Sequence, residues 1–305
     1  MIYTQFDSSY LSRAIMMIKS IRAFDSEIEL AVICYDILSM RYCDSISKQY
    51  NLIVYFDKDI PIQGLSTEVI LNRSRAEYIW GRKSEIACFL LETHKVSFIC
   101  YVDADIYFFQ PPSKILDKQH QFDMSFLSHD FVKYENNFVS SHIAGHWSAQ
   151  WVFFKNSSLG KVYSKMWSSM CGFWCGENPE DGRYGDQKYL EYFQANEGVF
   201  GIEKSGGCGP WNVNQYAFDD IIFYHFHGFR LLPRSNYFQI GPYRIAIEHI
   251  QRIYWPYLSE LISLNNELNN IGIKSLDSQK LSMKRKLFYL LNQNWLKNCE
   301  KISNT

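Results

Sequence analysis

Two acidic residues stand one residue apart where an apolar run ends. Phe98–Val102 consists of apolar and aromatic residues, and Asp103, Ala104 and Asp105 follow it directly. The run is too short for a helix, so we interpret it as a buried strand that ends with a pair of carboxylates. In open α/β sheets, ligands bind at the carboxyl ends of the strands. The pattern therefore indicates a candidate binding site at one edge of a sheet.

The acidic pair is suited to a hard divalent cation. Alternate residues of an extended chain point to opposite sides, so Asp103 and Asp105 can reach one ion only if the chain turns between them. Mg²⁺ or Mn²⁺ bound there would hold a substrate diphosphate. A plain acidic turn in solvent is the alternative, because a motif this short is weak evidence by itself.

Further candidate residues lie in segments where an ordinary structural role is also open. A helix expected over residues 73–91 carries Arg73 and Lys83 near the ligand edge of the sheet, where such cations either bind anions or form a solvated face. Asp186 follows a glycine at the start of a short helix, where a carboxylate commonly acts as a cap. His225 lies in an apolar strand, and a lone histidine there is commonly structural.

Strand and helix patterns alternate around these candidates. The apolar runs predict strands at residues 2–5, 29–35, 52–55, 98–102, 122–127, 150–154 and 221–226. The spacing of apolar residues predicts helices at 10–21, 38–50, 73–91 and 159–170. This order is typical of a doubly wound α/β sheet. Residues 172–183 are rich in Gly, Glu, Asp and Pro, and we interpret them as a long loop of the kind that carries function.

Length, composition and charge restrict the class of protein. The 305 residues are 47% apolar, which supports one large domain or two small ones. A formal net charge of −1 provides no basic field, so nucleic acid is not expected as a partner. The eight cysteines are scattered, which indicates buried reduced thiols rather than a zinc site. No signal-peptide or membrane-spanning pattern is found, and we expect a cytoplasmic location.

The order of the motifs resembles that of the GT-A class of nucleotide-sugar glycosyltransferases. It is most similar to the branch that includes glycogenin and the bacterial lipopolysaccharide galactosyltransferases, and to a group of bacterial surface-polysaccharide glycosyltransferases. The matching motifs are residues 4–10, 73–78, 101–105, 185–190, 210–212 and 224–228. The resemblance implies an α/β fold, a Rossmann-like mixed sheet flanked by helices. It implies a catalytic domain over residues 1–240, with a nucleotide-sugar half at 1–112 and an acceptor and catalytic half at 113–240, followed by a helical C-terminal extension at 241–305.

The resemblance also implies a metal site. Asp103 and Asp105 would be two of its ligands, and His225 would be the third, because His225 and Gly228 keep the spacing of the family's His-x-x-Gly element. Imidazole suits Mn²⁺ better than the harder Mg²⁺, so Mn²⁺ is the expected ion and Mg²⁺ the alternative. His227 is the alternative third ligand.

Donor contacts follow from the same resemblance. Thr4 would hold the nucleoside by a hydrogen bond, and Tyr10 would hold it by a ring contact. Glycogenin-like enzymes have a lysine after the His-x-x-Gly element that binds the diphosphate, whereas this chain has Arg230. Arg230, Arg73 and Lys83 are the candidates for that positive charge. A planar guanidinium and a compact ammonium group are not interchangeable in binding a phosphate.

Asp186 and Gln187 resemble the family's Asp-Gln pair beside the anomeric carbon. They would position the sugar and stabilise an oxocarbenium-like centre, with retention of the anomeric configuration. The expected reaction is transfer of a hexose from a nucleoside diphosphate sugar, with UDP favoured, to a glycan or lipid-linked acceptor of bacterial surface polysaccharide.

Two alternatives remain open, and a third is disfavoured. An inverting enzyme would need a carboxylate base, which Glu177, Glu180 or Asp181 could supply. A non-catalytic sugar-binding protein of the same fold would not need the acidic pair, His225 and Asp186 together. A metal-dependent phosphatase is disfavoured, because the usual threonine or valine two residues after the Asp-x-Asp pair is replaced by Tyr107.

The C-terminal region contains a basic amphipathic segment at residues 284–296. Such a segment could lie on a membrane surface, which would make the protein peripheral on the inner membrane, or it could be an ordinary terminal helix packed on the domain.

Overall fold

The fold is built on a seven-stranded mixed sheet. The computed structural model describes residues 1–62, 72–131, 141–232, 237–241, 243–275 and 296–298. The strand order is β3-β2-β1-β4-β7-β6-β8. These strands are β1 (Ile2–Phe6), β2 (Leu30–Cys34), β3 (Leu52–Phe56), β4 (Phe98–Val102), β6 (Met124–Ser128), β7 (Trp147–Lys155) and β8 (Val199–Ile202). Strands β1 to β4 are parallel, and β7 runs antiparallel to both β4 and β6.

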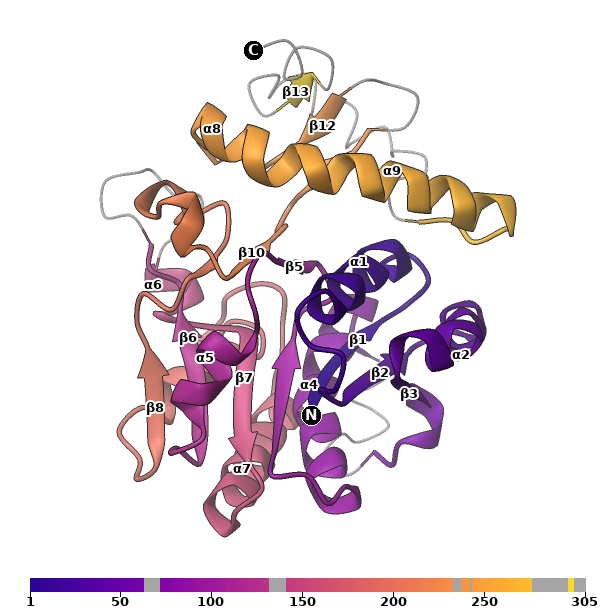
Figure 1. Cartoon of the computed structure of the whole chain (residues 1–305). Helices are drawn as coiled ribbons and strands as arrows, with labels where there is room; N and C mark the ends of the chain where they lie inside the picture. Colours follow the sequence, from indigo (N-terminus) through magenta and orange to yellow (C-terminus); the bar gives the residue numbers. More distant parts are fainter. Residues whose placement is uncertain (63–71, 132–140, 233–236, 242, 276–295, 299–305) are drawn as a thin grey trace.

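Helices cover both faces of the sheet (Figure 1). One face packs against α1 (Leu11–Arg22), α2 (Ile37–Tyr50) and α5 (Ser113–Gln119), and the other against α4 (Arg75–Thr93) and α7 (Ser158–Phe173). Alternate residues of β1 divide between the two cores: Ile2 packs on the α1 side and Tyr3 on the α4 side. Burial on both faces explains why these strands are nearly continuous apolar runs.

The expected α/β class, with a mixed sheet flanked by helices, is confirmed. Six of the seven predicted strands correspond to β1, β2, β3, β4, β6 and β7. The seventh corresponds to β10 (Phe223–His225), which belongs to a separate three-stranded sheet with β5 (Ile106–Phe108) and β9 (Gly207–Cys208). Strand β8 and helix α5 were not predicted, because both are short and β8 includes a glycine.

The small sheet connects the acidic motif to a distant part of the chain. After Asp105 the chain enters β5, which pairs antiparallel with β10 rather than with the large sheet. In this register Ile106 lies opposite His225. The pairing therefore brings His225 next to the residue that precedes Ile106.

The C-terminal elements lie across one end of the large sheet, above β10, β5 and α1 in Figure 1. They are α8 (Ile247–His249), the π-helix η5 (Ile250–Tyr254) and α9 (Trp255–Asn270), together with β11 (Arg230–Leu231), β12 (Tyr237–Gln239) and β13 (Leu296–Asn298). Tyr257 stacks on Phe226 with ring centroids 3.6 Å apart. The extension thus shares a core with the sheet domain, and the proposed division at residue 240 stays a prediction.

The remaining elements are short: η1 (Asp57–Asp59), α6 (Ser141–Ala144), η2 (Lys188–Tyr192), η3 (Val213–Gln215) and η4 (Phe218–Asp220). No helix among the described residues has the length and apolar character needed to cross a bilayer. The basic segment at 284–296 lies outside the described residues, apart from Leu296 in β13.

Candidate active site

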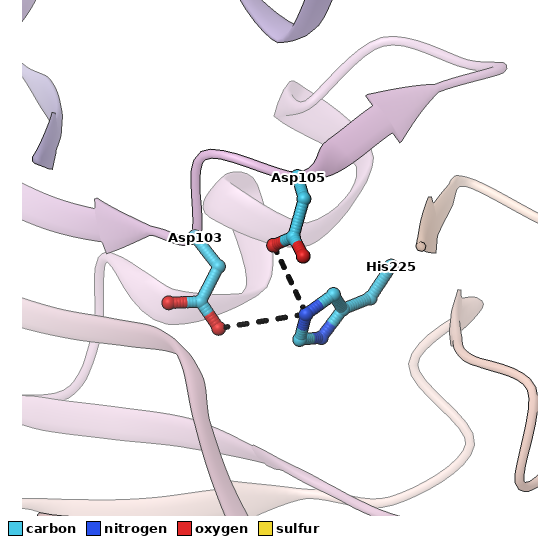
Figure 2. A group of neighbouring side chains, drawn as sticks. All are labelled: Asp103, Asp105 and His225. Carbon is cyan, nitrogen blue, oxygen red and sulfur yellow. Dashed lines mark ion pairs between the residues drawn. The ribbon is translucent and has the colours of Figure 1, made fainter. Parts of the chain in front are cut away.

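A turn between two strands brings the acidic pair together. Strand β4 ends at Val102, and the backbone N–H of Ile106 donates to the carbonyl oxygen of Asp103 at 3.3 Å. The carboxylates of Asp103 and Asp105 therefore both face the ring of His225, as Figure 2 shows. This is the turn that a shared ion requires, because an uninterrupted strand would have separated the two side chains.

Three side chains converge at this turn. Atom Nε2 of His225 lies 3.1 Å from Oδ1 of Asp105 and 3.9 Å from Oδ2 of Asp103. One ligand atom from each residue lies within 4.8 Å of the other two. Two carboxylate oxygens and one imidazole nitrogen fit a divalent cation of the Mn²⁺ or Mg²⁺ type. Within the described part of the chain, no other His, Cys, Asp and Glu group of this kind is found.

Electrostatics within this group favour the ionised form of Asp105. Burial raises the pKa of Asp105, but the attraction of His225 outweighs burial and lowers that pKa to about 2. Burial disfavours the charged form of His225, but the neighbouring Asp105 and Asp103 outweigh burial and raise its pKa. A cation that binds Nε2 must therefore displace a proton from an imidazole that the two acids have made more basic.

Gln150 on β7 contacts two of the three residues. Its Oε1 lies 2.7 Å from Nδ1 of His225. Its backbone carbonyl accepts a hydrogen bond from the N–H of Asp103 at 3.0 Å. The antiparallel pairing of β7 with β4 places Gln150 at this position, just beyond the paired residues Val102 and Trp151. Gln150 was not identified from the sequence, because nothing local distinguishes it from other buried strand residues.

Lys83 on α4 joins the acidic pair to a second acid. Its Nζ lies 2.7 Å from Oδ2 of Asp186 and 3.7 Å from Oδ1 of Asp103. It also donates to the carbonyl of Ala149 at 3.2 Å and lies 4.3 Å from the ring centroid of Tyr101. Burial lowers the pKa of Lys83, but the two acids outweigh burial and raise it. The lysine therefore remains charged in a buried position.

Asp186 contacts Lys83 from a different segment of the chain. It follows Gly185, whose φ of 53° is in the left-handed region and turns the chain at this point. Burial raises the pKa of Asp186, and the pairing with Lys83 opposes that rise only in part. The next residue, Gln187, donates from Nε2 to the carbonyl of Ala144 at 3.0 Å.

A cavity of about 180 Å³ connects these residues. It brings together five of the predicted site residues, Asp103, His225, Lys83, Asp186 and Gln187. The other lining residues are mainly aromatic or small: Trp80, His129, Phe131, Ala144, Ser148, Ala149, Gln150, Tyr184, Gly185, Trp211, His227 and Tyr243. A concave site with aromatic walls and a few convergent charges is typical of a binding site for a small molecule.

His225 rather than His227 faces the acidic pair. The ring of His227 packs 5.8 Å from the indole of Trp211 and 5.6 Å from the ring of His225. Trp211 also links two parts of the cavity lining, because its Nε1 donates a hydrogen bond to the carbonyl of His129 at 2.8 Å. The motif that contains Trp211 was noted in the sequence, but its contact with the two histidines depends on tertiary structure.

Four predicted donor-binding residues do not line the cavity. Thr4 is buried on β1, and Tyr10 lies at the start of α1 with 37% of its surface exposed. The guanidinium of Arg73, just before α4, donates to the carbonyls of residues 171 and 172 at the end of α7. Arg230 is buried in β11. Their proposed roles toward a nucleotide stay predictions.

The three candidate bases for an inverting reaction lie in an exposed loop. Glu177 and Glu180 are exposed, and Asp181 forms an ion pair with Arg183 at 3.0 Å. None of the three lines the cavity.

Comparison with known sequences finds two full-length relatives without an assigned role. No protein-family model matches the chain. YfnF, an uncharacterized protein of Bacillus subtilis (strain 168), is 25% identical over 299 residues, which cover 88% of this chain and 96% of YfnF. YfnD of the same organism is 22% identical over 274 residues, which cover 83% of this chain and 86% of YfnD.

Solved structures identify the fold. The glycosyltransferase GlyE of Streptococcus pneumoniae TIGR4 matches with a TM-score of 0.53 and 12% identity over 92% of this chain; the match spans 65% of GlyE, less than two thirds of its length. The galactosyltransferase LgtC, solved with donor and acceptor sugar analogs, matches with a TM-score of 0.50 and 14% identity, over 74% of this chain and 87% of LgtC. The chain has the GT-A glycosyltransferase fold, and its Asp103, Asp105 and His225 form a group that could hold a metal ion.

Proposed function

We propose that this chain is a metal-dependent hexosyltransferase that uses a nucleoside diphosphate sugar, with UDP as the favoured nucleotide. The observation that carries the proposal is the convergence of Asp103, Asp105 and His225 beside a cavity that Asp103, His225 and the Lys83–Asp186 pair line. A binding protein without catalytic activity would not need an electrostatically linked group of this kind beside its ligand.

Mn²⁺ is the favoured ion, with Mg²⁺ as the alternative, because the set of ligand atoms includes an imidazole nitrogen. When bound by Asp103, Asp105 and His225, the cation would neutralise negative charge that develops on the departing diphosphate. Within the protein, Gln150 orients the imidazole, and Lys83 balances the charge of the two acids that it contacts.

Asp186 and Gln187 are proposed to position the transferred sugar. Lys83 holds the carboxylate of Asp186, and Ala144 holds the amide of Gln187, so both side chains are fixed before a ligand arrives. A preorganised carboxylate stabilises positive charge at an anomeric carbon without reorganisation during the reaction. The location of Glu177, Glu180 and Asp181 outside the cavity lining supports retention over inversion.

The proposed acceptor is a glycan or a lipid-linked sugar of bacterial surface polysaccharide, modified on the cytoplasmic side of the membrane. The aromatic residues of the cavity wall support a carbohydrate acceptor, since flat apolar rings pack against the faces of sugar rings. LgtC, which shares this fold, was solved with an acceptor sugar analog, and this supports a carbohydrate acceptor by analogy of fold.

A screen of nucleotide sugars tests the proposal. The purified chain is incubated with UDP-, GDP-, and dTDP-linked hexoses and Mn²⁺, and release of nucleoside diphosphate is measured by chromatography. We expect slow hydrolysis of at least one donor, abolished by EDTA and restored by excess Mn²⁺. If no donor is hydrolysed and none binds, the alternative of a non-catalytic sugar-binding protein or another chemistry replaces the proposal.

A further inference from the structure

The side chain of Gln150 has an arrangement that its contribution to stability does not explain. The residue is 2% exposed, and its Oε1 lies 2.7 Å from Nδ1 of His225. Its Nε2 is buried and has no hydrogen-bond partner among the described residues. A buried donor without a partner costs roughly 1–3 kcal/mol, which offsets the contribution of the hydrogen bond to His225.

The hydrogen bond to His225 determines which ring nitrogen can bind a cation. With Oε1 as the acceptor, Nδ1 must carry the proton, and the lone pair of a neutral ring is then on Nε2. Nε2 is the atom that faces Asp103 and Asp105, at 3.9 and 3.1 Å. If the amide were turned over, Nε2 of Gln150 would donate to Nδ1, and the proton of the neutral ring would block the metal-facing nitrogen.

Gln150 also acts on the acidic pair through its backbone. Its carbonyl accepts the N–H of Asp103 at 3.0 Å, at the point where β4 ends and the turn to Asp105 begins. One residue of β7 is therefore bonded to ligand candidates from β10 and from the β4–β5 turn, which are far apart in the sequence.

We propose that Gln150 is a positioning residue for the metal site: its amide oxygen holds His225 in the tautomer whose Nε2 binds the cation. The inference rests on the metal site of the proposed function. The unpaired Nε2 of Gln150 is then available to a ligand in the cavity that this residue lines. Partners of this kind, which hold the second nitrogen of a metal-binding histidine, typically change metal affinity 10- to 100-fold when they are removed.

Two variants of Gln150 separate positioning from packing. Gln150→Met keeps the approximate volume and removes both polar atoms, whereas Gln150→Glu keeps an oxygen that accepts the Nδ1 proton. Binding of Mn²⁺ alone is measured by calorimetry and by the loss of the free Mn²⁺ resonance in electron paramagnetic resonance. We expect Gln150→Met to raise the Kd for Mn²⁺ roughly 10- to 100-fold. We expect Gln150→Glu to bind Mn²⁺ at least as tightly as the wild type.

Two readouts show that a loss of affinity comes from His225. Electron spin echo modulation from a bound imidazole nitrogen should be strong in the wild type and in Gln150→Glu, weak in Gln150→Met, and absent in His225→Ala. Urea unfolding should show nearly unchanged stability in Gln150→Met, because removal of the unpaired Nε2 offsets the loss of the partner of His225 Nδ1. A roughly 10- to 100-fold weaker metal binding at nearly unchanged stability is not expected from damaged packing.

Three results would overturn the inference. They are wild-type Mn²⁺ affinity in Gln150→Met, equal loss of affinity in both variants, and a wild type that binds neither Mn²⁺ nor Mg²⁺. These experiments contain no nucleotide, so a wild type that binds Mn²⁺ but turns over no nucleotide sugar would end the proposed function and leave the role of Gln150 standing.

Discussion

Lys83 and Asp186 form a buried ion pair in which Nζ lies 2.7 Å from Oδ2. The same ammonium group lies 3.7 Å from Asp103, so a single lysine joins the proposed sugar-positioning acid to the proposed metal site. The pair crosses the cavity from α4 to the turn after Gly185. Each of these acids therefore depends on the charge of Lys83.

Removal of Lys83 should destabilise the protein strongly. Lys83→Met leaves Asp186 buried without its cation, and breaking a buried pair in this way typically costs about 3–5 kcal/mol. In the double variant Lys83→Met/Asp186→Leu we expect most of that loss to be recovered, because no uncompensated charge remains beside the new apolar groups. Urea unfolding of Lys83→Met, Asp186→Leu, the double variant and the wild type measures the coupling energy between Lys83 and Asp186. Additive losses in the double variant would contradict a direct interaction.

Asp103→Asn should abolish turnover of the nucleotide sugar without unfolding the chain. The amide keeps the volume but removes a charge from the metal site, and a metal contributes several kcal/mol of charge stabilisation, which corresponds to a loss of about 10³-fold. The matched control is Asp117→Asn on α5, an exposed residue outside the cavity lining. Survival of turnover in Asp103→Asn, with normal circular dichroism, would refute the metal proposal.

The product should keep the anomeric configuration of the donor. Asp186 and Gln187 line the cavity, whereas the candidate bases Glu177, Glu180 and Asp181 do not. Proton NMR of the first product, recorded before the anomers equilibrate, gives the configuration directly. An inverted anomer would refute the retaining mechanism and would require a catalytic base from outside the cavity lining.

The stability of helix α2 should depend on pH through Asp36. Burial raises the pKa of this carboxyl, but hydrogen bonds from the backbone N–H groups of Ser39 and Ser8, both at 2.8 Å, outweigh burial and lower it. Because the folded pKa is lower than the unfolded one, the stabilisation is present above the unfolded pKa and is lost as pH falls through the folded value.

Asp36→Ala should therefore cost about 1 kcal/mol near pH 7, the usual value of an N-cap, and less as the pH approaches 3. Urea unfolding at several pH values measures the difference from the wild type. Asp36→Asn is the control, since its amide oxygen can still accept a hydrogen bond but does not titrate over this range. A cost in Asp36→Ala that is the same at pH 3 and pH 7 would show that the carboxylate charge contributes nothing.

Local sequence patterns determined the elements and one half of the site. Strand β4 could be predicted because five consecutive apolar residues, bounded by acids, satisfy a strand buried on both faces. The acidic pair could be placed at its carboxyl end for the same reason. The order of motifs also indicated the GT-A fold, since motif order along the chain is itself a property of the sequence.

The motif resemblance predicted that His225 would join the acidic pair, but only the tertiary structure shows how these distant side chains meet. His225 reaches Asp105 because β10 pairs with β5 in a register that sets Ile106 opposite His225, and a shift of one residue would turn that imidazole away. Gln150 carries no local signal, and only the pairing of β7 with β4 brings it to the imidazole. Strand register and helix packing depend on the balance of contacts over the whole core, whereas residue spacing along the chain reports only local periodicity.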